Sequence, residues 1–118
     1  MIQVTETPYG LSLFIPGERA SADLSWIDPE GLFYYNLPPG KWLFFNRLIN
    51  FSGKPGLGTQ LIDELLSICR KKGYSILNQV SAYGRLNQKQ LEKWYISKGF
   101  IPVDYGKYGN KLLKWEPK

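Results

Sequence analysis

The chain has 118 residues, a length that suits one domain, and we expect residues 1–118 to form a single one. Its 43% apolar content indicates a packed core. The chain has no histidine, which excludes Ser-His-Asp and Cys-His nucleophile pairs and the usual histidine-bearing metal sites. No metal is therefore predicted. The net charge of +5 is uneven: −2 before Ser52 and +7 from Ser52 onward, which implies an anionic partner such as nucleic acid, a membrane surface or a phosphorylated cofactor.

Cellular location is predicted from what the sequence lacks. A single cysteine, Cys69, permits no intrachain disulfide, and a reducing compartment is the easier fit. No apolar run is long enough to span a membrane, and the N-terminus has no signal-peptide pattern. We therefore expect a cytoplasmic protein without a membrane partner.

The first half of the chain is predicted to form strands. Ile2–Glu6 and Leu11–Ile15 are short candidate strands on either side of a turn. Ala20–Trp26 alternates apolar and polar residues, which is typical of a half-buried antiparallel strand. Asp28–Gly31 is predicted as a turn, followed by Leu32–Leu37 as strand or loop.

The pattern changes after a central strand predicted over Lys41–Phe51. Apolar residues then recur every three or four positions from Leu57 to Cys69, which predicts an amphipathic helix ending at Gly73. Tyr74–Tyr83 is the next predicted strand.

A second helix is predicted from Asn87 as N-cap, with Gln90 completing a capping box, to Gly99. Ile101–Val103 and Asn110–Trp115 follow as strands, joined by residues 105–109. The whole order indicates an α/β (mixed α+β) architecture, in which an antiparallel half leads into a βαβ-like unit.

The segment Ser52–Thr59 joins the central strand to the first helix and holds three glycines. Exposed backbone N–H groups at a positive helix end are what a pyrophosphate needs, and Gly56 and Gly58 let a ligand approach the backbone closely. Lys54 can add a cation and Thr59 a hydroxyl. A tight turn without ligand is the alternative, while the spacing matches neither a Walker A loop nor the dinucleotide fingerprint.

Two motifs carry a family resemblance. Gly56–Leu61, running into a helix, resembles the acyl-CoA loop of the Gcn5-related N-acetyltransferases (GNAT), whose motif is Arg/Gln-x-x-Gly-x-Gly/Ala. Leu91–Phe100 resembles their second signature, a helix ending in Tyr-x-x-x-Gly-Phe. The resemblance covers residues 48–100 well and the rest in strand order, and it extends to the very small acetyltransferases among phage anti-CRISPR proteins.

The resemblance implies a central, mostly antiparallel sheet with a splayed strand pair and two main helices. It implies N-acetyltransferase activity with acetyl-CoA as cosubstrate, by direct attack of an amine. A protein lysine is one candidate for this amine, and a homodimer is one candidate assembly. Tyr95 matches the tyrosine that protonates the leaving CoA thiolate, and the alternative is a core aromatic beside Trp94. The implied cofactor-binding residues are Arg47, Leu48, Ile49, Gly53, Lys54, Pro55, Gly56, Leu57, Gly58, Thr59 and Asn87.

The sequence departs from the family at three places. Gly53 stands where the motif has Arg or Gln, and the central strand has no glutamate for a general base. Thr7–Ser12 is too short for the helix pair that forms the acceptor lid, which predicts a substrate side that is open or built by a partner, and a macromolecular acceptor. A base is then sought elsewhere, in a water chain or among Glu18, Asp23, Asp28, Glu30 and Asp104.

Two further functions stay open. One is a catalytically inactive protein of the same fold that binds and inhibits another protein, which the missing base and Gly53 favour. The other is a nucleic-acid-binding module, which net charge and aromatic residues favour but for which no motif is legible, so nucleic acid is the less favoured partner. The tyrosines that would supply its stacking surface are Tyr34, Tyr35, Tyr83, Tyr105 and Tyr108.

Overall fold

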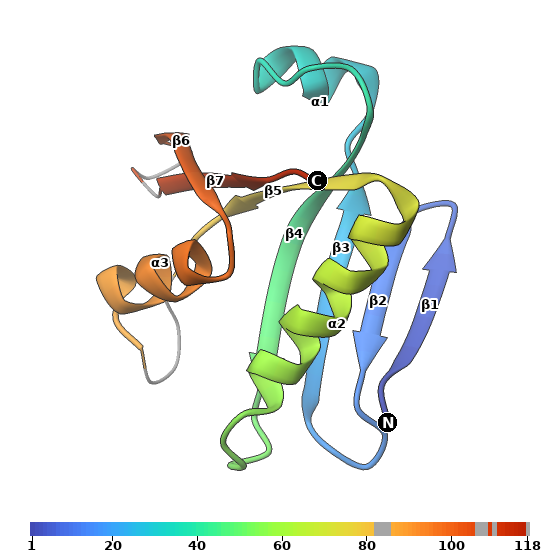
Figure 1. The fold of residues 1–118 in the computed structure, drawn as a ribbon, viewed down its shortest axis with the longest axis vertical. Helices are drawn as coiled ribbons and strands as arrows, with labels where there is room; N and C mark the ends of the chain where they lie inside the picture. The colour runs from blue at the N-terminus through green and yellow to red at the C-terminus, as the bar shows by residue number, and fades with distance from the viewer. Residues whose placement is uncertain (82–85, 106–108, 110, 118) are drawn as a thin grey trace.

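The computed structural model of the chain describes residues 1–81, 86–105, 109 and 111–117 (Figure 1). Within these residues a seven-stranded sheet has the order β1-β2-β3-β4-β5-β7-β6. Every neighbouring pair is antiparallel except β4 and β5, which are parallel. The strands are β1 (Gln3–Thr7), β2 (Gly10–Phe14), β3 (Ala20–Trp26), β4 (Lys41–Asn50), β5 (Tyr74–Gln79), β6 (Ile101–Tyr105) and β7 (Lys111–Trp115).

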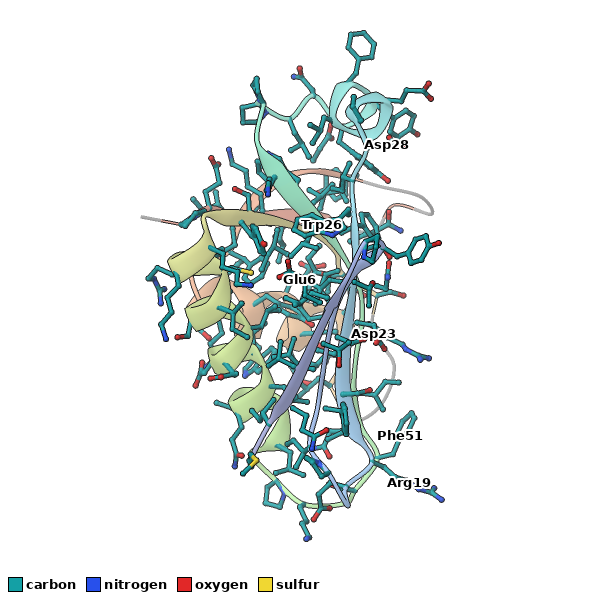
Figure 2. The ribbon with its side chains drawn as sticks, turned by 90° about the vertical axis from the view of Figure 1, so that its right-hand side faces the viewer. Glu6, Arg19, Asp23, Trp26, Asp28 and Phe51 are labelled. Carbon is teal, nitrogen blue, oxygen red and sulfur yellow. The ribbon has the colours of Figure 1, made fainter. Side chains whose placement is uncertain are left out.

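Helix α2 (Leu57–Lys72) connects the two parallel strands and lies against one side of the sheet (Figures 1 and 2). It ends at Gly73, whose φ of 76° is the left-handed cap that the sequence predicted. Helix α3 (Gln88–Ser97) begins with the predicted capping box of Asn87 and Gln90. No helix in the described part of the chain has the length and apolar character needed to cross a membrane.

The main core lies between the sheet and the inner faces of α2 and α3. It is formed by the alternate strand residues that point to this side, such as Leu13, Leu43 and Ile76, all fully buried. Helix α2 contributes the apolar positions that its periodicity predicted, with Leu61 and Leu65 fully buried. The inward-facing residues predicted from the strand alternation and from the helix period therefore pack in one hydrophobic cluster.

Segment 28–37 differs from its prediction. Instead of a turn followed by strand or loop, it holds a short helix, α1 (Pro29–Tyr34), and Leu32 of this helix packs against the opposite face of the sheet. Asp28 is its N-cap and accepts a hydrogen bond from Gly31 N at 2.7 Å, and Pro29 occupies the first helical position, where no N–H is needed. A second, smaller core of Trp42, Leu77 and Leu112 lies on this face.

The later strands also differ in their bounds. Strand β5 ends at Gln79 rather than Tyr83, and β6 reaches Tyr105 rather than Val103. The predicted strand start at Asn110 and most of the connection before it lie outside the described residues.

Edge strand β1 is exposed along its length, and besides its pairing with β2 one carboxylate joins it to the rest of the fold. Glu6 accepts hydrogen bonds from Lys72 Nζ and from the Tyr74 hydroxyl, each at 3.1 Å. The bond from the Lys72 ammonium lowers the pKa of Glu6, and the same pairing raises the pKa of Lys72. This contact joins the first strand to the end of α2 and the start of β5.

We expect Leu65→Ala to destabilise the fold by about 2–5 kcal/mol, because a fully buried side chain is lost and leaves a cavity. Urea unfolding followed by circular dichroism measures the change. The exposed neighbour Glu64→Ala is the control and should stay within about 0.5 kcal/mol of the wild type. Similar effects for the two variants would contradict the placement of α2.

Candidate functional site

The parallel strands β4 and β5 separate halfway along β4. Their pairing ends at Phe45 and Asn78, while β4 continues to pair with β3 up to Asn50. A bulge on β4 lies at this point: Phe45 pairs with Leu24 and Arg47 pairs with the preceding Asp23, so Asn46 is the extra residue. Because a bulge bends and twists its strand, β4 turns away from β5, as Figure 1 shows.

A narrow cleft of about 90 Å³ lies where the two strands part. One wall comes from β4, the other from the end of β5, and α3 covers it. Its volume is below the range of small-ligand sites, so it admits only a thin part of a ligand. The lining residues are Phe45, Asn46, Arg47, Leu48, Asn78, Gln79, Val80, Ser81, Leu91 and Tyr95.

Tyr95 of α3 is both a core residue and a cleft residue. Its ring is 5% exposed and packs edge-on against Trp94, Phe100 and Phe45, with centroids 5.0, 5.4 and 5.9 Å away. The same side chain lines the cleft. The two interpretations that the sequence left open, core aromatic and site residue, are therefore compatible, since the aromatic contacts hold the phenol in one position.

Asn78 is one of the cleft residues that the sequence analysis did not single out. It is 4% exposed, and its Nδ2 is the buried side-chain nitrogen or oxygen in the described part of the chain that has no hydrogen-bond partner. An unmade hydrogen bond of this kind costs about 1–3 kcal/mol. The signal was present in the sequence, because Asn78 follows Ile76 at strand spacing and so shares its inward side.

The glycine loop that precedes α2 has the geometry of an anion site. Gly53 and Gly56 have φ of 79° and 86°, a conformation that side chains rarely adopt, and a Cβ on either would meet nothing within 4 Å. Gly56 is the N-cap of α2 and no side chain caps the helix, so the first-turn N–H groups of Leu57, Gly58 and Thr59 face an uncapped end. The glycines are needed for the turn, and the turn leaves the helix end open.

Hydrogen bonds within the loop hold it in shape. Asn50 Nδ2 donates to Lys54 O at 3.0 Å, and Asn50 Oδ1 accepts from the Ser52 hydroxyl at 2.6 Å. The Lys54 N–H donates to Ser52 Oγ at 3.0 Å. Phe51 N donates to Arg19 O at 2.7 Å and so anchors the loop to the residue just before β3, at the end of the molecule labelled in Figure 2.

The two cations that the sequence assigned to this site are engaged in ion pairs. The Lys54 ammonium pairs with Glu18, and Arg47 Nε bonds Asp23 Oδ2 at 3.0 Å on the exposed face of β3. Glu18 and Asp23 were themselves candidate bases. Both predicted cations are therefore paired in the ligand-free protein, and the uncapped first-turn N–H groups of α2 are further donors at this loop.

The other predicted residues divide between the site and its surroundings. Leu48 lines the cleft, and a Cβ on Gly58 would lie 3.9 Å from its Cδ2. Ile49 pairs with β3 and is not among the cleft residues. The side chain of Asn87 accepts from Gln90 N at 2.9 Å as the N-cap of α3 and likewise lies outside the cleft lining. Pro55 is exposed in the loop.

A wider hollow of about 580 Å³ lies on the face that carries α1. The end of α1 and its following turn form one side, and β5, β6 and β7 form the other. Gln79 lines both this hollow and the narrow cleft, so the two adjoin at the end of β5. Of the five candidate bases, Asp104 alone is among the residues that line it. Sequence reasoning missed the hollow because it missed α1.

The described residues hold no group of three or more His, Cys, Asp or Glu side chains placed to bind a metal ion. Cys69 is fully buried in α2, and burial raises the pKa of its thiol to about 12. A thiol of this kind is a core group rather than a nucleophile.

We expect Cys69 to resist alkylation by iodoacetamide at pH 8 in the folded protein, because the thiolate is the reactive form and burial suppresses it. Unfolding in guanidinium should restore the rate of a free thiol. Mass spectrometry of the two samples makes the comparison. Rapid labelling of the folded chain would show that α2 exposes this position.

Comparisons with known proteins agree with this geometry. No protein-family model and no curated protein matches the chain. Among solved structures, the anti-CRISPR protein AcrVA5 matches with a TM-score of 0.59 and 17% identity, over 89% of this chain and 96% of that one. An acetyltransferase from Thermus thermophilus matches with a TM-score of 0.51 and 21% identity, over 92% of this chain and 63% of its own length. The chain has a GNAT-like fold.

Proposed function

We propose that residues 1–118 form one acyl-CoA-binding domain and that the protein is an N-acetyltransferase with acetyl-CoA as cosubstrate. The observation that carries the proposal is the cleft between β4 and β5, with Tyr95 in its wall and an unpartnered buried amide at its base. The uncapped N-terminus of α2 lies directly after β4, so an anion site and an extended cleft follow one another along the chain.

The residues present fit such a ligand. The unpartnered Nδ2 of Asn78 needs a hydrogen-bond acceptor, which an acyl-pantetheine arm has in its carbonyl groups. The first-turn amides of α2 would hold the pyrophosphate, and Arg47 and Leu48 border the cleft as strand residues. When bound, acetyl-CoA supplies an acetyl group activated as a thioester.

The reaction joins an amine nitrogen to the acetyl carbon, breaks the carbon–sulfur bond, and moves one proton from the amine and one to the sulfur. Tyr95 holds a phenol in the cleft and would supply the proton to the sulfur. We propose direct attack by the amine, because the buried Cys69 thiol, with a pKa of about 12, is unsuited to carry an acyl group.

The hollow under α1 supports an amine acceptor. Its volume of about 580 Å³ is in the range of small-ligand sites. Asp104 offers a carboxylate to a cationic amine, and Tyr34 and Tyr35 offer aromatic surface. Because a carboxylate and aromatic rings line this hollow, we propose an extended amine, such as a lysine side chain, as acceptor.

An inactive inhibitor of the same fold is the second candidate. The likeness to AcrVA5, an anti-CRISPR protein, is compatible with an inhibitor and says nothing about lost activity; two exposed aromatic residues of α1, Phe33 and Tyr34, which are 89% and 76% exposed, favour protein binding. Retained binding of acetyl-CoA without turnover would single out this function. Nucleic-acid binding has less support, because Arg47 and Lys54, the two cations that the sequence assigned to the site, are paired with carboxylates.

We expect calorimetric titration to show micromolar binding of acetyl-CoA and of free CoA. Gly56→Ala should weaken both by at least about tenfold, because a side chain at this φ strains the turn that presents the α2 amides. Gly73→Ala is the matched control, since Gly73 has a φ of 76° and equal open space and lies at the opposite end of α2 from the glycine loop. Wild-type protein that binds neither ligand would refute the proposal.

We expect Tyr95→Phe to lower kcat by about 10²-fold while the Kd for acetyl-CoA stays within about twofold, because the ring contacts remain while the phenol hydroxyl, the proposed proton donor, is removed. Release of CoA thiol with poly-lysine as the probe acceptor measures turnover. Tyr74→Phe, a buried tyrosine outside the cleft, is the control and should leave kcat unchanged. Unchanged turnover of Tyr95→Phe would remove the assigned role.

A further inference from the structure

We propose that the side-chain amide of Asn78 is a ligand-positioning donor: its Nδ2 donates a hydrogen bond to a carbonyl oxygen of the acyl-pantetheine arm in the cleft. The inference rests on the proposed function and adds to it a residue that neither motif includes. Two carbonyl positions share this chemistry, the thioester carbonyl and the amide carbonyls of the arm, and the experiment below separates them.

The position of Asn78 in the sheet accounts for its unmet hydrogen bond. Its partner across β4 is Phe45 and its partner across β7 is Leu113, so apolar side chains flank it on both sides. It shares the inward side of β5 with Ile76, which is fully buried. None of these neighbours can accept a hydrogen bond through its side chain, and Asn78 is 4% exposed, so water has little access.

Asn78 is also the last residue of β5 that pairs with β4. One residue further along, the strands have parted and the cleft begins, with Tyr95 in the same lining. The unpartnered amide therefore stands at the closed end of the opening, where a ligand entering along β4 would end. A donor at this end meets the reactive portion of the ligand rather than its pyrophosphate.

The chemistry of the group selects the kind of ligand atom. A neutral amide nitrogen donates, so its partner is an acceptor such as a carbonyl oxygen and not a cation. For stability alone, an aliphatic residue like its neighbours Ile76 and Leu77 would serve better, because a buried donor without a partner is unfavourable. A ligand that accepts this hydrogen bond would remove the cost of the unpartnered donor. The bond would also be stronger than in water, because it forms in an environment of low polarity.

The test compares wild type with Asn78→Leu, which keeps much of the shape and removes the donor. Asn78→Leu should unfold in urea at a midpoint equal to or above that of the wild type, because the unpartnered group is gone. Its affinity for acetyl-CoA in calorimetry should fall at least tenfold. Asn78→Ala is the second variant, and it should show the same loss of affinity whether or not its stability falls.

The two ligands distinguish the two carbonyl positions. A loss confined to acetyl-CoA assigns the bond to the thioester carbonyl, and an equal loss for acetyl-CoA and CoA assigns it to an amide of the arm; either result supports the inference. Variants that bind both ligands as tightly as the wild type overturn it while the proposed function stands. Wild-type protein that binds neither ligand overturns both.

Discussion

Five residue pairs join β4 to β5, and this short parallel ladder is the constraint on which the rest of the structure depends. Strands β1 to β4 lie on one side of it, and β5, β7 and β6 lie on the other. The bulge at Asn46 ends the ladder by bending β4, and α3 then covers the opening. A ladder that continued to Asn50 would close the cleft and leave Tyr95 as a core residue only.

Elements with a strong local pattern were predicted well from the sequence. The alternation in Ala20–Trp26, the three- to four-residue period of α2 and the capping box at Asn87 are confirmed, because each depends on neighbours within a few residues. Helix α1 was not predicted, although Asp28 and Pro29 are a common N-cap and first helical residue. The aromatic residues that follow them suit a strand as well as a helix, so the local pattern was ambiguous. The bulge has no local signature, since it is a relation between two strands.

The candidate site was predictable in part for the same reason. The glycines and Tyr95 belong to short motifs, so a linear reading finds them, and the GNAT-like fold is confirmed. The ion pair between Lys54 and Glu18 joins residues 36 positions apart, and no sequence pattern predicts that the loop's cation is already engaged. In the proposed site, anion recognition would then rest mainly on backbone N–H groups, so raising the salt concentration should weaken binding less than it would at a site built on a free lysine.

Strand β5 has a consequence for how the chain folds. Its partners on both sides are distant in sequence: Lys41 pairs with Tyr74, 33 positions away, and Gln79 pairs with Leu112, also 33 positions away. The other strand pairs include several hairpin neighbours whose loops are short. Docking of β5 therefore has a larger loop-closure entropy than pairing of the hairpin strands, and contacts of this sequence separation slow folding; the strand that forms the base of the cleft is thus expected to join the sheet after the hairpins.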